Sequence, residues 1–449
     1  MKYPAAYHCP DFDPASLLFR LRERNPAFPL VHIDRERATG WSYVPVAISS
    51  VLEESGNGSR LWWAGHSDPV PSESRWEDHP LLSRPLFLEP DRNDAFRQSG
   101  RQDPSFTSGV ILLLPFEMGE LWEPSGGLFS SPRVPAFLCD CREVVAFHAP
   151  TGRVFLPSGF DRTLLRPVDF SAPPPVRLKT SCDRDGFSAL MDPIRESLKC
   201  GDYFQLNIAL DFRSPLPEGF DPLALYFRMR RRSPSLFGGF FSFGNHFLLS
   251  HSPEQLLSMD ERRVRTLPIA GTAKGEVSAE EEEPLRQEAK LLAEHIMIVD
   301  LLRNDIGRVS VPGSVRVPRF LAIETYPHLR HLVSEVTGEV DKRFSRSDVI
   351  KSLFPGGSVT GAPRIRVRKH TSILEREPRN YYCGSLGFVS DSGVLDLSLL
   401  IRTLEGEREG KSGTLTLKAG AGIVADSDVD DEFGEIMLKA QAIREMLTS

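Results

Sequence analysis

The clearest hydrophobic pattern in the chain is a period of two over residues 203–210. Phe204, Leu206, Ile208 and Leu210 are apolar, and they alternate with Tyr203, Gln205 and Asn207, whose side chains carry polar atoms. A two-residue period is that of a β-strand. The pattern therefore predicts a strand whose Gln205 and Asn207 side chains point the same way.

A second two-residue period covers Val394–Thr403, where leucine and isoleucine alternate with mostly polar residues. If this segment is one strand, Arg402 shares a face with Asp396 and Ser398. The sequence therefore predicts a strand over Val394–Thr403 that carries an arginine and an acidic residue on one face.

Apolar residues three and four positions apart predict three helices. The first has its apolar stripe at residues 187–198 and ends near Gly201. The second runs from Pro284 to about Asn304, with Glu294 beside its apolar stripe. The last covers about Asp430–Leu447 and carries polar residues at helical spacing on another side, namely Glu432, Glu435 and Lys439.

Residues 1–170 form a different kind of region, rich in proline, tryptophan and phenylalanine, with short apolar runs between turn residues. This pattern favours short strands joined by loops. The proline cluster SAPPPVRL at residues 171–178 is a natural connection to the rest of the chain. We expect an N-terminal strand-rich region at 1–170 that contributes to the sheet core, and a catalytic region at 171–449.

Composition narrows the class of protein. With 40% hydrophobic and 26% charged residues and a net charge of -7, the chain of 449 residues reads as a globular protein without a basic surface for nucleic acid. Its six cysteines show no paired zinc-site spacing, which favours reduced thiols in the cytoplasm. No apolar run has the length of a signal peptide core or a membrane span, so we expect no membrane partner.

Compact polar and glycine-rich motifs mark the candidate functional region. The most informative is FPGGSVTGAP at Phe354–Pro363, whose glycines permit close backbone approach. Alone it reads as an ordinary loop. Five further motifs accompany it: GDYFQLNIAL at 201–210, PIAGTAKG at 268–275, AEHIMIVDLLRNDIGRV at 293–309, CGSLGFVSDSGVLDLSLLIRT at 383–403 and GAGIVADS at 420–427.

These motifs, in this order, resemble the chorismate-binding enzymes: anthranilate synthase component I, aminodeoxychorismate synthase component I, and the isochorismate and salicylate synthases. The resemblance extends from about Lys179 to Ile443. It implies an α/β fold of the α+β type, with layered, mainly antiparallel sheets and flanking helices in one intertwined unit like that of anthranilate synthase.

The resemblance also implies a magnesium site. Mg²⁺ prefers oxygen ligands, and the family's metal glutamates match Glu294 and Glu435, with Glu432 close by. The alternative from the residues alone is that these glutamates form surface ion pairs with Lys290 and Lys439.

The remaining site residues are implied in the same way. Arg402 matches the family's carboxylate-binding arginine, whose alternative role is a salt bridge to Asp396. Tyr382 and the backbone amides of Gly420, Ala421 and Gly422 match further contacts to substrate carboxylates, although the glycines alone indicate only a tight turn. Three residues match groups near the reacting ring, where they would handle protons or line the pocket: His331, Thr360 and Glu254.

Within the family, the TGAP and FQLN segments look most like aminodeoxychorismate synthase component I. This member would aminate chorismate with ammonia to give 4-amino-4-deoxychorismate, on the route to 4-aminobenzoate and folate. The chain shows no glutamine amidotransferase nucleophile, so we expect ammonia from solution or from a separate amidotransferase subunit.

Two departures from the family pattern keep alternatives open. Ala270 stands where many aminodeoxychorismate synthases have a lysine nucleophile, and only Lys274 could substitute. Anthranilate synthase component I carries alanine at this position. Leu291 stands where an acidic residue commonly precedes the metal glutamate. The alternatives are an anthranilate synthase component, for tryptophan biosynthesis, and a non-catalytic binding subunit of the same fold.

Overall fold

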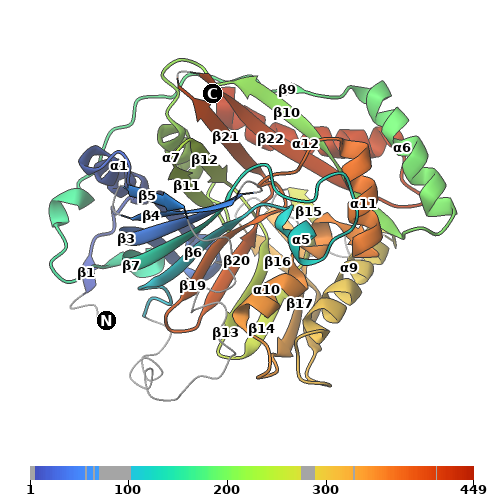
Figure 1. Ribbon diagram of the computed structural model, residues 1–449, viewed down its shortest axis with the longest axis horizontal. Coiled ribbons are helices and arrows are strands. Elements are labelled where there is room, and N and C mark those ends of the chain that lie inside the picture. Colours follow the sequence, from blue (N-terminus) through green and yellow to red (C-terminus); the bar gives the residue numbers. More distant parts are fainter. Residues whose placement is uncertain are drawn as a thin grey trace.

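The computed structural model describes residues 6–55, 58–63, 66–69, 103–274, 289–326, 329–410 and 412–448. Within these ranges the strands form one hydrogen-bonded network that folds into two layers, and the layers join at a strand from the N-terminal half (Figure 1). Helices lie on the outer sides of both layers.

The first layer combines strands from the beginning, the middle and the end of the chain. Its neighbours pair antiparallel. In pairing order they are β1 (Ala6–His8), β8 (Arg153–Phe155), β7 (Ala136–His148), β3 (Trp41–Ser55), β2 (Leu30–Arg35), β11 (Gly239–Phe243), β12 (His246–Ser250), β21 (Thr403–Glu409), β22 (Ser412–Ile423) and β10 (Gln205–Pro215). Short strands β9 (Lys179–Thr180) and β18 (Gly361–Ala362) also pair with β10.

The second layer starts where β6 (Gly109–Leu114) pairs with β7. It continues, again antiparallel, through β19 (Ser385–Ser390), β20 (Leu395–Leu399), β13 (Gln255–Asp260), β14 (Arg263–Leu267) and β17 (Leu329–Glu339), which also pairs with β15 (Ile269–Lys274) and β16 (Arg316–Tyr326). A side branch extends β3 through β4 (Gly58–Trp63) and β5 (His66–Pro69).

Three apolar cores hold these elements together. The core between the layers takes side chains from both, such as Tyr43 on β3, Leu113 on β6 and Phe388 on β19. Burying side chains of this size contributes about 1.5–3 kcal/mol each to folding. This central core therefore fixes the two layers against each other.

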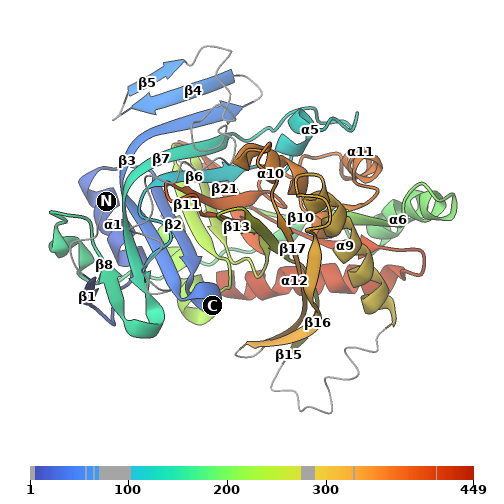
Figure 2. The ribbon, with the colours of Figure 1, turned by 90° about the horizontal axis from the view of Figure 1, so that it is seen from below.

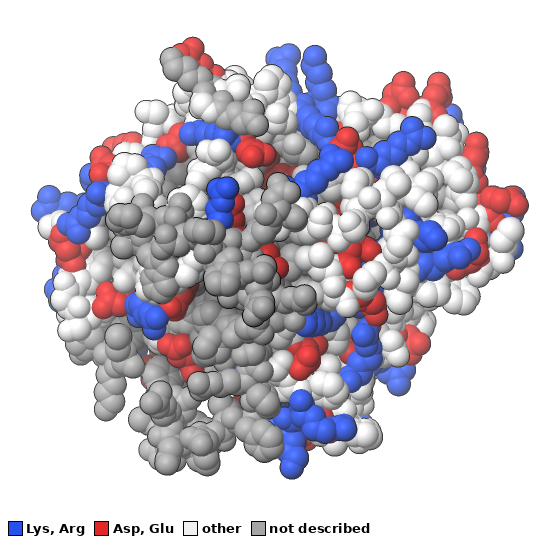
Figure 3. Space-filling view, in the orientation of Figure 1, with Lys and Arg blue, Asp and Glu red and all other residues white. Residues whose placement is uncertain are grey.

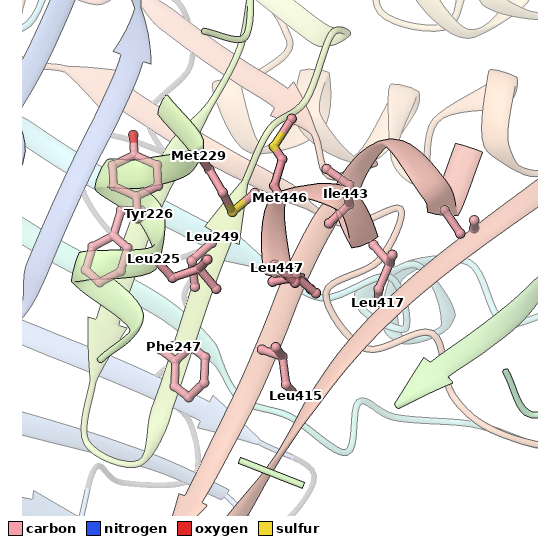
Figure 4. Close-up of a cluster of buried hydrophobic side chains, with 14 of the residues drawn as sticks. Leu225, Tyr226, Met229, Phe247, Leu249, Leu415, Leu417, Ile443, Met446 and Leu447 are labelled. Atoms are coloured by element: carbon pink, nitrogen blue, oxygen red, sulfur yellow. The ribbon is translucent and has the colours of Figure 1, made fainter. Parts of the chain in front are cut away.

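A second core lies outside the first layer. Among the described helices, α1 (Pro14–Arg24), α6 (Arg184–Lys199), α7 (Pro222–Arg232) and α12 (Val429–Thr448) cover that face. Figure 4 shows part of it, where Leu447 and Ile443 of α12 pack near Leu415 and Leu417 of β22. The C-terminal helix α12 is thereby held along β22 (Figure 1), and Figure 2 shows it along the lower side of the molecule.

The third core lies outside the second layer, under α9 (Ala289–Gly307) and α10 (Arg346–Leu353). Helices α2 (Glu36–Thr39) and α5 (Met118–Trp122) are short, and α11 (Arg364–Glu375) contributes Val367 to the core outside the first layer. The expected fold class, mainly antiparallel sheets flanked by helices, is confirmed. Strands that precede position 170 pair with strands that follow it, since β2 pairs with β11 and β6 pairs with β19.

The predicted strand at 203–210 is confirmed as β10, although it begins at Gln205. Its even-numbered positions Leu206, Ile208 and Leu210 are buried in the core under the first layer's helices. Phe204 precedes the strand and is 68% exposed. The three predicted helices correspond to α6, α9 and α12, and the expected start of the second, at 284–288, lies outside the described residues.

The prediction of one strand over Val394–Thr403 is wrong. Strand β20 ends at Leu399 in the second layer, and β21 begins at Thr403 in the first. The chain changes layers between them, and Arg402 takes a φ of 49°, which breaks the two-residue alternation. Asp396 pairs with Arg35 of β2 at 2.7 Å instead of with Arg402.

Candidate active site

The glycines of the GAGI segment lie in a strand rather than in a turn. Gly420 and Gly422 belong to β22 and face Ala209 and Asn207 of β10. A Cβ on Gly422 would lie 2.4 Å from Gln205 Nε2, and one on Gly420 would lie 2.6 Å from the Ile208 carbonyl oxygen. Any larger residue would therefore collide with β10.

Several polar atoms gather beside Gly420. A Cβ at that position would lie 2.9 Å from Asn207 Oδ1 and 3.1 Å from the Tyr382 hydroxyl. Tyr382 is buried, at 6% exposed. Within the described part of the chain, Asn207 Oδ1 and Gln205 Oε1 accept no hydrogen bond. Buried polar atoms are normally paired, so these oxygens are available to a bound molecule or to water.

Glu254 contributes a carboxyl group suited to proton transfer near neutral pH. It is 8% exposed, and the Ser358 hydroxyl donates a 2.8 Å hydrogen bond to its Oε1. Burial raises the pKa of Glu254 to about 7, while the Ser358 hydrogen bond and the Lys439 charge act in the opposite direction. Such a group can both hold and release a proton at physiological pH.

Thr360 lies on the same glycine-rich segment as Ser358. Its hydroxyl donates to the Gly356 carbonyl at 3.0 Å, and its own carbonyl accepts from Asn207 N at 2.8 Å. Thr360 therefore joins the FPGGSVTGAP turn to β10, and its hydroxyl oxygen keeps acceptor capacity for a ligand.

Arg402 carries a positive charge that no described acidic side chain neutralises through a salt bridge. Burial lowers the pKa of its guanidinium. Its backbone carbonyl accepts from His251 N at 3.2 Å, which places the arginine beside the segment that leads to Glu254. A shielded guanidinium that pairs with none of the described carboxylates is a suitable binding group for a substrate carboxylate.

Helix α12 carries the predicted glutamates in two different environments. Glu432 is 2% exposed and accepts a 2.6 Å hydrogen bond from Ser427, although the helical pattern places it on a polar face. Glu435 is about half exposed, and its Oε1 lies 2.6 Å from Lys439 Nζ. Lys439 also donates to the Gly420 carbonyl at 2.9 Å, so this ion pair adjoins the polar atoms around Tyr382.

Glu294 projects from α9, a different helix, and is partly buried. Among the described residues, no three His, Cys, Asp or Glu side chains gather as a ready set of metal ligands. Carboxylates are nonetheless the donors that Mg²⁺ prefers, and it usually keeps water and substrate oxygens as its other ligands. The donor types fit the predicted ion, and the magnesium site stays a prediction.

Other predicted residues can be placed only by their backbones. His331 lies on β17, opposite Thr272 of β15 and Glu324 of β16. Lys274 is the last residue of β15. The side chains of His331 and Lys274, and those of Ala270 and Leu291, lie outside the described part of the structure.

The sequence patterns did not single out Arg379, a buried charged residue next to the candidate site. Arg379 is 2% exposed, and its Nη2 lies 2.7 Å from Glu375 Oε1. Two further buried carboxyl groups accept hydrogen bonds from the backbone at residues 379–381, one from Glu117 and one from Glu405. The four-residue spacing of Glu375 and Arg379 in EREPR gives no helical signal for this pair, because α11 ends at Glu375 and Arg379 follows Pro378 outside the helix.

The surface carries charges of both signs. On the face shown in Figure 3, blue Lys and Arg side chains are interspersed with red Asp and Glu side chains. None of the helices in the described ranges combines the length and the apolar character needed to cross a membrane.

Comparisons with known proteins agree with this geometry. Residues 77–445 match the chorismate binding enzyme family. The chain is 40% identical to the anthranilate synthase component I-like protein of Synechocystis sp. over 274 residues, which are 60% of this chain and 56% of that protein. It is 35% identical to aminodeoxychorismate synthase component 1 of Escherichia coli over 273 residues, 60% of this chain and 59% of that one.

One relative aligns over nearly the whole chain. Anthranilate synthase component 1 of Cereibacter sphaeroides is 30% identical over 471 residues, 96% of this chain and 91% of that protein. In the solved structures, anthranilate synthase component I of Streptococcus pneumoniae superposes with a TM-score of 0.73 at 24% identity, covering 91% of this chain and 92% of that one, which shows the shared fold.

The alignments with the Synechocystis and Escherichia coli relatives cover little more than half of the length of each relative. The family match is longer and takes in the segments that carry Glu254, Thr360, Tyr382, Arg402 and Glu435. The chain belongs to the family of chorismate-binding enzymes.

Proposed function

We propose that this protein aminates chorismate with ammonia to give 4-amino-4-deoxychorismate, in a reaction that depends on Mg²⁺. The observation that carries the proposal is the convergence of Tyr382, Asn207 and the Gly420 backbone beside Lys439. Arg402, which forms no salt bridge with a described acidic side chain, lies in another of the family motifs. A doubly charged acid needs this combination of cationic and polar groups.

The reaction exchanges the ring hydroxyl of chorismate for an amino group and releases water. We expect Arg402 to bind a substrate carboxylate, and Tyr382 with Gly420, Ala421 and Gly422 to line the other end of the ligand. When bound, Mg²⁺ would supply positive charge to substrate oxygens, with Glu294, Glu435 and Glu432 as the residues that hold it.

Two groups would move protons. The departing hydroxyl must gain a proton, which is the role proposed for His331, and the incoming nitrogen must lose one, which suits Glu254. The pKa of Glu254, raised by burial to about 7, allows that carboxylate to accept a proton near neutral pH. Thr360 would line the ring.

Ammonia would come from a separate glutamine amidotransferase subunit or from solution. The names of two similar proteins, aminodeoxychorismate synthase component 1 and anthranilate synthase component 1, describe each as one component. We extend this two-component arrangement to the present chain as part of the proposal.

One residue favours a second candidate, anthranilate synthase component I. Ala270 stands where the family members with a covalent mechanism have lysine, and a methyl group cannot act as a nucleophile. Direct attack of ammonia on the ring is therefore the expected route for either product.

Product analysis tests the proposal. Purified protein is incubated with chorismate, Mg²⁺ and ammonium chloride. The products are separated by chromatography and identified by mass spectrometry. We expect aminodeoxychorismate, which becomes 4-aminobenzoate only after a lyase is added. Fluorescent anthranilate without a lyase would assign the second candidate, and unchanged chorismate would assign a non-catalytic binding role.

A further inference from the structure

The turn that carries Tyr382 is held by two buried carboxyl groups from distant parts of the chain. Glu117, from the N-terminal half, accepts from the backbone N of Arg379 at 2.7 Å and of Asn380 at 3.2 Å. Glu405 of β21 accepts from Tyr381 N at 2.9 Å. Three consecutive backbone amides are thus held before the chain reaches Tyr382.

The same turn contains unfavourable backbone angles. Asn380 has a φ of 57° and Cys383 a φ of 64°, in the left-handed region that residues other than glycine seldom occupy. Such conformations persist only where surrounding contacts over-determine them, and they concentrate at functional sites. The conformation of this turn is therefore imposed by its partners.

The Arg379 side chain ties this turn to two other elements. Its Nη1 donates to the Val359 carbonyl at 2.7 Å, and its Nη2 donates to the Asn207 carbonyl at 2.8 Å. Its Nε and Nη2 also donate to Glu375, at 3.0 and 2.7 Å. The guanidinium carbon lies 5.8 Å from the centre of the Tyr382 ring.

Each of these partners adjoins a group assigned to the site. Val359 precedes Thr360 in the chain, and Asn207 is the β10 residue opposite Gly422. Tyr382 is three residues beyond Arg379 in the same turn. One buried side chain therefore connects the glycine-rich turn, the floor formed by β10 and β22, and the tyrosine.

We propose that Arg379 is a positioning residue for the substrate site, which holds Tyr382, Thr360 and Asn207 in register without touching the substrate. This inference rests on the proposed function for its ligand, chorismate. A guanidinium can donate in several directions within one plane, whereas an ammonium cannot reproduce that fork. Lysine at this position would keep the charge beside Glu375 and lose at least one carbonyl contact.

The test compares Arg379→Lys with the wild type. Chorismate dissociation constants are measured by calorimetry and steady-state constants by product formation. We expect weaker chorismate binding and a loss in kcat/KM of about 100-fold, the size of effect that a displacement of about 1 Å produces in an active site.

A matched control separates positioning from general stability. Arg346 is also buried, at 6% exposed, and its Nε donates to the Gly393 carbonyl at 3.4 Å on the hairpin between β19 and β20. Arg346→Lys should lower the melting temperature and leave the chorismate dissociation constant unchanged.

A double-mutant cycle supplies a second readout. If Arg379 acts through the tyrosine, Arg379→Lys should cost less in a Tyr382→Phe background than in the wild type. If Arg379→Lys does not fold, Glu375→Gln carries the test, because it weakens the hold on Arg379 and should weaken chorismate binding about threefold to tenfold.

The outcomes distinguish this inference from the proposed function. Wild-type protein that does not bind chorismate overturns the proposed function. If the wild type binds chorismate, two results overturn the positioning role. One is an unchanged dissociation constant in the folded Arg379→Lys or Glu375→Gln variant. The other is strictly additive costs in the double-mutant cycle.

Discussion

At the scale of single residues, burial decides what a carboxyl group can do. Glu254, Glu117 and Glu405 all have their pKa raised to about 7, in each case mainly by burial. Glu435, by contrast, is about half exposed and paired with Lys439. The same residue type is therefore suited to proton transfer, holds backbone amides or forms an exposed ion pair, according to how much water reaches it.

A pH profile tests the role of Glu254. If its carboxylate accepts a proton from the incoming nitrogen, kcat/KM should rise with pH through about 7, the pKa to which burial raises this group. Glu254→Gln should remove that rise and lower the rate by about 100-fold. The measurement holds free ammonia constant at each pH, because ammonium itself titrates.

Ser358→Ala is the control for the Glu254 profile. The Ser358 hydrogen bond lowers the pKa of Glu254, so its loss should move the rising limb to higher pH. An unmoved limb in this variant, or a retained limb in Glu254→Gln, would assign the ionisation to another group.

At the scale of elements, helix α12 contributes side chains both to the apolar core and to the candidate site. Its apolar side holds Ile436, Ala440 and Ile443 in the core, and its polar side presents Glu435 and Lys439 to the end of β22. The apolar stripe is predictable from the 3.6-residue period of a helix. The contact between Lys439 and the Gly420 carbonyl is not, because it depends on how the helix crosses the strand.

We expect Glu435→Ala to abolish magnesium-dependent turnover and to leave thermal stability nearly unchanged. The ion pair with Lys439 is about half exposed, and exposed pairs contribute about 0–1 kcal/mol to stability. Turnover is measured against Mg²⁺ concentration, and unfolding is followed by circular dichroism.

Glu445→Ala provides the control on the same helix. Glu445 is exposed and hydrogen-bonded to Gln441 at 2.8 Å, so its loss should change neither turnover nor stability appreciably. A large drop in the melting temperature of Glu435→Ala would instead make Glu435 a structural residue.

At the scale of the whole molecule, the N-terminal half supports the candidate site rather than standing apart from it. Strand β6 pairs with β19, and Phe116 N donates to the Asn380 carbonyl at 2.7 Å. Glu117 follows directly and clamps the Tyr382 turn. Residues more than 250 positions apart along the chain, such as Glu117 and Arg379, are therefore neighbours at the site.

Stability should consequently depend on pH through Glu117. Its pKa is raised from 4.5 to about 7 in the folded protein, mainly by burial, so the folded state binds the proton more tightly than the unfolded state. The stability from this group is complete below about pH 4.5 and is lost as pH rises through about 7.

Glu117→Gln should make the free energy of unfolding less dependent on pH in this window, by up to about 1.4 kcal/mol per pH unit. Urea unfolding at several pH values measures the slope. Part of the slope should remain, because burial raises the pKa of Glu405 to about 7 as well. An identical slope in wild type and variant would contradict the assigned pKa shift.

The sequence by itself determined the family resemblance, the fold class and the buried faces of β10 and α12, because periodicity and motif order are local properties. It failed at Arg402, where alternation predicted a strand face that the crossing between layers interrupts. Only the tertiary structure decided that Asp396 pairs with Arg35, and that Glu117 and Arg379 support Tyr382. These contacts join segments far apart in the chain, and no local pattern encodes which buried charges will meet.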